Sequence, residues 1–144
     1  MSKAKKKKRS FLKKKEQYNR KEEWLYHLLL GLWMLGIFIL SSIEGSDEPH
    51  YSLKVFIERK AAHIFEFFVL SYLLYKVLVF YKLNFKRRLV LVFLPSLLYA
   101  VLDEFHQLFV FGREGKLLDV GVDVIGILSF LMLVYFSESK DNES

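Results

Sequence analysis

The chain alternates long apolar runs with short charged segments. The first run, residues 24–43, has no formal charge and is long enough for a helix to cross a hydrocarbon core about 30 Å thick. Further apolar runs cover residues 61–81, 89–102 and 117–136. The pattern predicts an all-α fold, a bundle of four transmembrane helices that occupies residues 23–137 as one membrane domain.

Segments of different composition separate these runs. Residues 44–59 and 109–116 are predicted to contain loops, because acids, glycine and proline interrupt the apolar pattern there. Residues 81–88 form a short turn with four basic residues and no acid. We expect the second helix to begin near Ser52 and to enter the bilayer at about Ala61.

Composition agrees with a small integral membrane protein. Hydrophobic residues make up 53% of the chain while its net charge is +6, so the charge is segregated from the apolar residues. The chain has no cysteine, which excludes disulfides, thiolate nucleophiles and cysteine-bound metals. A basic balance can indicate nucleic acid or an anionic membrane surface. With so much apolar chain we expect the lipid bilayer as partner and no nucleic acid.

The basic residues predict an orientation in the cell membrane. Residues 1–22 form a basic tail with eleven Lys or Arg, and such an excess near a first helix holds that end in the cytoplasm. This tail can also bind anionic lipid, at about 1 kcal/mol per basic side chain. The 81–88 turn is expected inside for the same reason. We therefore predict a multi-pass protein with both termini cytoplasmic, including the polar tail 138–144, and with the other two loops outside.

Ionisable residues interrupt the helices at their predicted extracytoplasmic ends. At 1.5 Å per residue, Glu66 lies about 8 Å below the outer start of the second helix and Asp123 about 9 Å below that of the fourth. Such residues are functional candidates by default, although buried structural ion pairs would explain them too. The candidates for this polar site are Arg59, Lys60, His63, Glu66, Asp103, Glu104, Gln107, Arg113, Asp119 and Asp123.

The charges of these candidates do not balance. Without Arg59, Lys60 and Arg113 face five carboxylates, which leaves three uncompensated negative charges if histidine is neutral. Because such charges are costly away from water, the site must hold protons, bind a cation or open to water. A divalent cation is therefore a candidate cofactor, with candidate metal ligands Glu66, Asp103, Glu104, Asp119 and Asp123.

Four polar segments, taken together, resemble the VanZ-like family. They are RKAAHIFEF (59–67), DEFHQ (103–107), FGREGKLLD (111–119) and the D-x-x-x-D-x-x-G spacing from Asp119 to Gly126. The resemblance covers about residues 30–136. It places the family's polar signature on Arg59, Lys60, His63, Glu66, Asp103, Glu104, Gln107, Arg113, Asp119 and Gly126.

The sequence departs from the family pattern at three positions. Ile64 stands where Phe is usual, and Phe67 where Tyr is usual. Asp123 stands where the family generally has Asn, so this chain carries one more negative charge at the site than a typical member. That charge alters the affinity expected for a metal or a proton.

The resemblance implies a role at the cell envelope, because the family is named for a membrane protein linked to low-level teicoplanin resistance. We expect a site that binds or acts on an envelope amphiphile, either a lipid-linked wall precursor or a lipoglycopeptide. Arg113 and Lys60 would orient an acidic group of that ligand. Glycopeptide resistance of the teicoplanin type is the phenotype that the resemblance implies.

Two other functions remain open. The first is a metal-dependent membrane enzyme that acts on a lipid or wall-precursor headgroup, with His63, Glu66, Asp103 and Glu104 as catalytic candidates. The second is a proton- or cation-coupled carrier, since relays of acids and histidine are typical of carriers.

Overall fold

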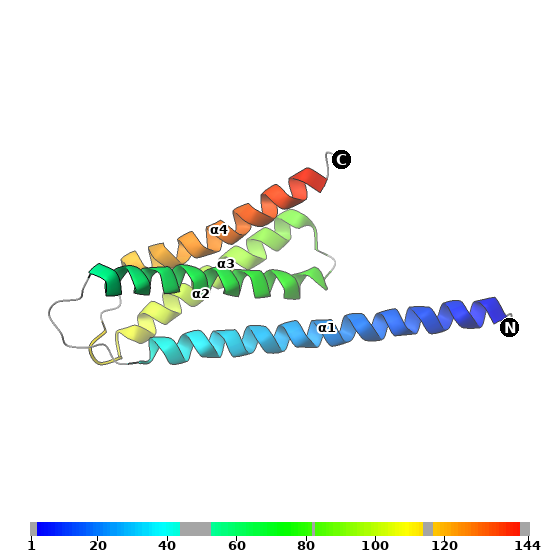
Figure 1. Cartoon of the computed structure of the whole chain (residues 1–144), viewed down its shortest axis with the longest axis horizontal. Helices are drawn as coiled ribbons and strands as arrows, with labels where there is room; N and C mark the ends of the chain where they lie inside the picture. Colours follow the sequence, from blue (N-terminus) through cyan, green and yellow to red (C-terminus); the bar gives the residue numbers. More distant parts are fainter. Residues whose placement is uncertain (1–2, 44–52, 82, 114–116, 142–144) are drawn as a thin grey trace.

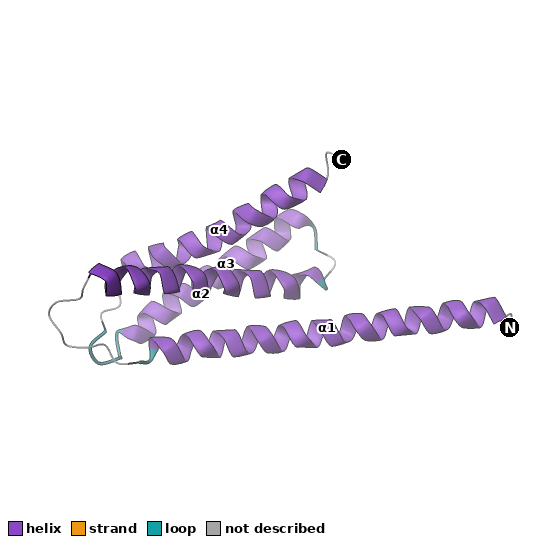
Figure 2. Ribbon diagram, viewed as in Figure 1, coloured by secondary structure: helices purple, strands orange, loops and turns teal. Residues whose placement is uncertain are grey.

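The structure, a computed structural model, describes residues 3–43, 53–81, 83–113 and 117–141. These residues form four α-helices and contain no strand (Figure 2): α1 (Lys3–Ser41), α2 (Leu53–Val79), α3 (Phe85–Gln107) and α4 (Leu117–Asp141). Each helix contains a segment that is long and apolar enough to cross a membrane, namely Arg20–Ser41, Ile57–Val79, Phe85–Gln107 and Leu117–Glu138. The prediction of an all-α fold with four helices long and apolar enough to span a membrane is confirmed for the described residues.

Three helix boundaries differ from the sequence prediction. α1 begins at Lys3, within the predicted basic tail, and α4 continues to Asp141, past the predicted end of the fourth span. α3 begins at Phe85, inside the predicted turn, because Asn84 caps it and accepts a hydrogen bond of 2.9 Å from the Arg87 backbone N–H. Apolar runs mark the part of a helix in hydrocarbon, whereas lysine, arginine and glutamate continue a helix well beyond it.

The helices run antiparallel in sequence order and define two ends of the bundle (Figure 1). We call the end where α1 and α3 finish and α2 and α4 start the loop end. The opposite end, where α2 joins α3, is the turn end; α1 starts and α4 finishes on that side. Residues 44–52, 114–116 and 142–144, which include parts of both predicted outer loops and of the predicted polar tail, lie outside the described residues.

α2 is the central helix, since it contacts each of the other three and packs most extensively against α4. Gly126 makes the α2–α4 contact close. A Cβ added at Gly126 would overlap the backbone carbonyl oxygen of Ile64, so a side chain there would push the two helices apart. Gly126 shares one stripe of α4 with Asp119 and Asp123, so the close approach lies just beneath these acids.

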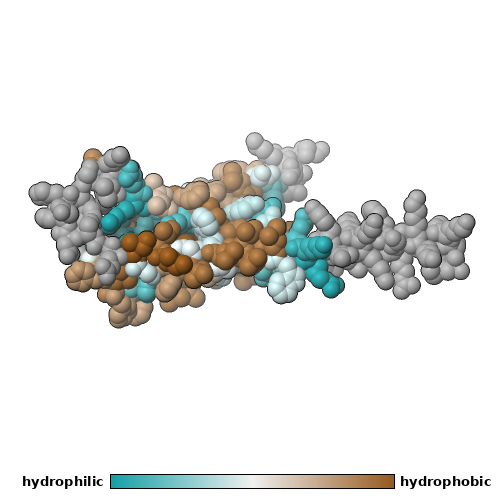
Figure 3. Space-filling model, turned by 60° about the horizontal axis from the view of Figure 1, so that its bottom comes forward, coloured by the Kyte–Doolittle hydropathy of each residue, from teal (hydrophilic) through white to brown (hydrophobic). Residues whose placement is uncertain are grey.

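A small apolar core lies along α2. Phe67 and Leu70 of α2 pack with Ile37 of α1, Ala100 of α3 and Ile127 of α4, and all five are buried. Large apolar side chains elsewhere point outward from all four helices, for example Leu32, Leu98 and Met132. Figure 3 shows a hydrophobic belt between hydrophilic groups at the two ends of the described part, which is the surface expected of a protein surrounded by lipid.

A polar contact joins three helices at the turn end. The Tyr75 hydroxyl donates to Oε1 of Glu138 at 2.7 Å and accepts from Nη1 of Arg88 at 3.0 Å. Arg88 also lies 3.7 Å from the Glu138 carboxylate. α2, α3 and α4 are therefore linked at this end by side chains whose charges balance.

Candidate functional site

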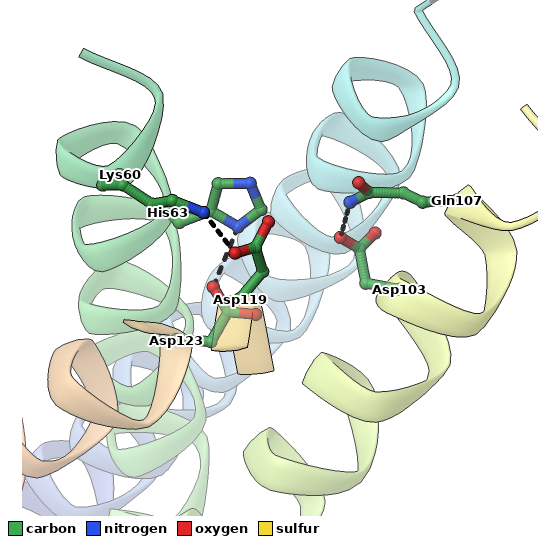
Figure 4. Close-up of polar contacts among 6 residues, drawn as sticks. All are labelled: Lys60, His63, Asp103, Gln107, Asp119 and Asp123. Atoms are coloured by element: carbon green, nitrogen blue, oxygen red, sulfur yellow. Dashed lines mark hydrogen bonds and ion pairs between the residues drawn. The ribbon is translucent and has the colours of Figure 1, made fainter. Parts of the chain in front are cut away.

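Two polar pairs join α2 to α4 at the loop end (Figure 4). Nζ of Lys60 donates to Oδ1 of Asp119, and one helical turn further in, Nδ1 of His63 lies 2.9 Å from Oδ1 of Asp123. We call these two successive pairs the ladder. They follow one another because residues 60 and 63 share one face of α2, and residues 119 and 123 share one face of α4. Exposure falls along it, from 24% for the Lys60 side chain to 13% for His63 and 0% for Asp123.

The last turns of α3 supply the third side of the cluster. Nε2 of Gln107 donates to Oδ2 of Asp103 at 2.9 Å, and both side chains extend from α3 toward the side of the bundle where the two pairs lie (Figure 4). Asp103, Glu104 and Gln107 are each at most 5% exposed. We call the residues Lys60, His63, Glu66, Asp103, Glu104, Gln107, Asp119 and Asp123 the polar cluster.

Within this cluster, three residues from three helices bring possible ligand atoms together. His63, Glu104 and Asp123 each offer one such atom, and the three atoms lie within 4.8 Å of one another. Oδ2 of Asp123 is buried and has no hydrogen-bond partner among the described residues. Because a buried carboxylate oxygen is costly unless it is bonded, this atom points to a missing cation or proton.

α1 closes the cluster from the fourth side through backbone carbonyls. The Trp33 indole donates to the Glu66 carbonyl at 3.0 Å, which ties α1 to the cluster-bearing turn of α2. Arg113, in the α3–α4 connection, donates to the carbonyls of Ile43 and Leu40 at 3.1 and 3.3 Å. These carbonyls end a helix and carry partial negative charge, so a guanidinium is a favourable partner for them.

The predicted site residues therefore fall into two groups. The first group is brought together across α2, α3 and α4 and consists of Lys60, His63, Asp103, Glu104, Gln107, Asp119 and Asp123. Glu66, also half-buried, lies one turn from His63 on α2, and the hydrogen-bond partner of His63 is Asp123 of α4. Arg113 caps α1, and Arg59 is half-buried beside Lys60.

Of the five predicted metal ligands, two lie in the group whose possible ligand atoms are within 4.8 Å of one another. Glu104 and Asp123 belong to the close group, and His63 joins them. Glu66, Asp103 and Asp119 remain in the surrounding cluster, where Asp103 and Asp119 have the hydrogen-bonded partners Gln107 and Lys60. The carboxylates still outnumber the cations in the cluster.

Sequence reasoning missed His106. Its ring lies 4.4 Å from that of Phe38, centroid to centroid, and its Nε2 lies 3.0 Å from Oγ of Ser42, so it docks the end of α3 on the end of α1. His106 stands between Asp103 and Gln107 in the sequence, and the two serines at the end of the first apolar run were the available signal. These residues mark polar positions in the sequence, but their spacing does not indicate that α1 and α3 meet there.

Comparisons with known proteins agree with this architecture. Residues 10–138 match the family described as VanZ/LLP1. The chain is also similar to a protein of Bacillus subtilis (strain 168) named "Uncharacterized membrane protein YwnJ", with 26% identity over 136 residues that cover 83% of this chain and 91% of that protein. No solved structure matches.

The family match extends the resemblance found in the sequence. It begins at residue 10 and ends at residue 138, so it includes all four membrane spans and every residue of the polar cluster. Since it covers well over half of the chain, this multi-pass membrane protein belongs to the VanZ/LLP1 family.

Proposed function

We propose that the protein binds the polar head group of a cell-envelope amphiphile in the polar cluster, on the extracytoplasmic side of the membrane. The observation that carries the proposal is the ladder of two α2–α4 pairs, which leads from a partly exposed ion pair at Lys60 and Asp119 to the fully buried Asp123. Such a gradient offers a head group charged partners at the rim and a desolvated carboxylate beneath them.

The distribution of basic residues supports this orientation of the protein in the membrane. The polar cluster lies at the loop end, and the basic residues Lys86, Arg87 and Arg88 at the start of α3 lie at the turn end. The same side carries the start of α1 with its lysines and arginines. Because lysine and arginine concentrate on the cytoplasmic side, the polar cluster faces out of the cell, where lipid-linked wall precursors and lipoglycopeptides are found.

Apolar side chains beside the cluster suit the other half of an amphiphile. Phe105 in the last turn of α3, and Phe109 and Phe111 just after this helix, are 57%, 74% and 69% exposed. Leu117 and Leu118 at the start of α4 are more exposed still. They adjoin the residues that form the polar cluster on the same helices. A ligand could therefore place its head group among the charges and its acyl chain along these side chains.

The test uses the full-length protein in lipid nanodiscs, with a purified lipid-linked wall precursor and fluorescently labelled teicoplanin as separate probes. We expect one probe to bind, and binding to weaken at least about tenfold in Lys60→Gln, since loss of a charged contact costs about 1.5–3 kcal/mol. Glu138→Gln, which changes a carboxylate at the turn end of α4, is the matched control. Equal affinity of Lys60→Gln, Glu138→Gln and the unchanged protein for both probes would refute the proposal.

One observation favours a second function, catalysis on the head group. The imidazole of His63 is held at 2.9 Å by the buried Asp123 carboxylate, the arrangement that orients a histidine as a general base. Mass spectrometry of each probe after incubation with the protein separates the two functions. A chemically altered probe identifies an enzyme, and an unaltered bound probe identifies a binding protein.

A further inference from the structure

The inner part of the polar cluster contains a donor set suited to a metal ion. His63 of α2, Glu104 of α3 and Asp123 of α4 each present one ligand atom, and these atoms lie within 4.8 Å of one another. Two atoms bound to one zinc ion are at most about 4.2 Å apart, since each bond is about 2.1 Å long. Side-chain rotations that move these atoms by about 1.5 Å or less would bring them to the separation of about 3.3 Å expected in a tetrahedral site.

Asp123 supplies independent evidence for a missing ligand. Its side chain is 0% exposed, and its Oδ2 has no hydrogen-bond partner among the described residues. Its other oxygen lies 2.9 Å from Nδ1 of His63, close to the separation of about 3.3 Å between two ligand atoms in a tetrahedral site. A cation bound by both oxygens of this carboxylate would satisfy the orphan oxygen, and its bond to an unprotonated Nδ1 of His63 would replace the hydrogen bond between the two side chains.

The charges lead to the same conclusion. With a neutral imidazole, Glu104 and Asp123 contribute two negative charges to a place where both side chains are at most 5% exposed. A divalent cation is attracted to two carboxylates in a desolvated site more strongly than a monovalent cation is. The nearby cation Lys60 is already paired with Asp119.

We infer that His63, Glu104 and Asp123 bind one divalent transition-metal ion at the loop end of the bundle. One imidazole and two carboxylates are a donor set for zinc, manganese or ferrous iron, because calcium and magnesium prefer sites built from oxygen ligands alone. Three protein ligands leave at least one coordination position open. If the proposed function holds, that position accepts a phosphate or carboxylate oxygen of the head group, which the carboxylates alone would repel.

The decisive experiment measures the binding of a metal ion in the absence of any amphiphile. Full-length protein in detergent is stripped with a chelator and titrated with Zn²⁺ or Mn²⁺ by isothermal calorimetry, and bound metal is counted by elemental mass spectrometry after gel filtration. We expect one ion per chain, with affinity reduced about a hundredfold or more in His63→Gln and in Asp123→Asn. Glu138→Gln should bind as the unchanged protein does. Absence of stoichiometric metal, or equal affinity in all four proteins, would overturn the inference.

A second variant guards against loss of binding by misfolding. His63→Cys keeps a metal ligand at the same place, and a thiolate bound to Co²⁺ gives an intense charge-transfer absorption band that imidazole does not. We expect this band in the His63→Cys protein and not in the double variant His63→Cys with Asp123→Asn. Stoichiometric Co²⁺ binding to His63→Cys without the band would place the ion elsewhere and refute the assignment.

The outcome for the metal is separable from that for the head group. Metal binding at these residues without binding of either amphiphile removes the proposed function and leaves the metal site standing. Amphiphile binding that is unchanged by a chelator, in protein shown to contain no metal, removes the metal site and leaves the proposed function standing.

Discussion

At the scale of single residues, the position of Gly126 determines how closely the cluster-bearing helices approach. Its Cα lies so near the Ile64 carbonyl that even a methyl group would overlap it. The contact is with backbone, so it cannot be relieved by rotation of a side chain. The geometry of the His63–Asp123 pair therefore depends on a residue that has no polar atom in its side chain.

Substitution of this glycine gives a direct stability test. Gly126→Ala should lower the free energy of unfolding by about 1–3 kcal/mol, because overpacking forces α2 and α4 apart. Gly121→Ala is the control on the same helix, since nothing lies within 4 Å of a Cβ there, and it should be neutral or stabilising by up to about 1 kcal/mol. Thermal unfolding in detergent, followed by circular dichroism, measures both; equal losses would contradict the close contact.

The pairing of individual residues was only partly predictable from the sequence. Spacing along α2 places Glu66 one turn from His63, whereas the structure pairs His63 with Asp123 of α4. Spacing defines the face of a helix, whereas the partner across the interface depends on how α4 is rotated and shifted against α2. That rotation is determined by packing, including the Gly126 contact, which no single-helix pattern contains.

At the scale of the elements, the four spans followed directly from apolar runs, because a bilayer demands uninterrupted apolar length. The ends of the helices were less predictable. α3 begins four residues before the predicted run, at the Asn84 cap, and helix propensity extends α1 and α4 into charged sequence. Which helices touch was not predictable either: α2 packs most extensively against α4, and α1 has its smallest interface with α3.

The end of α1 depends on a long-range cap. Arg113 donates to the Leu40 and Ile43 carbonyls, so Arg113→Ala should leave these carbonyls without their partner and loosen the last turn of α1. We expect hydrogen exchange at Ser42 and Ile43 to rise about fivefold or more, as one or two hydrogen bonds worth about 1 kcal/mol each are lost. Exchange in the middle of α2 should not change. An unaltered last turn of α1 would show that the cap contributes nothing.

At the scale of the whole molecule, the arrangement of ends makes the orientation testable. The chain has no cysteine, so single cysteines can be introduced without background. We expect Phe111→Cys, at the loop end, to react in intact cells with a maleimide that cannot cross membranes. Arg87→Cys, at the turn end, should react only after permeabilisation. The reverse pattern would place the polar cluster in the cytoplasm and remove the proposed envelope ligand.

The α2–α4 pair is the most extensive helix interface of the bundle and has polar contacts at both of its ends. Lys60 and His63 contact α4 at one end, and Tyr75 contacts Glu138 of α4 at the other, so polar contacts hold this helix pair at both ends. α1 meets α3 over the smallest of the helix interfaces. A lipid that enters the protein sideways would therefore separate the fewest packed residues between α1 and α3, beside the ring of His106.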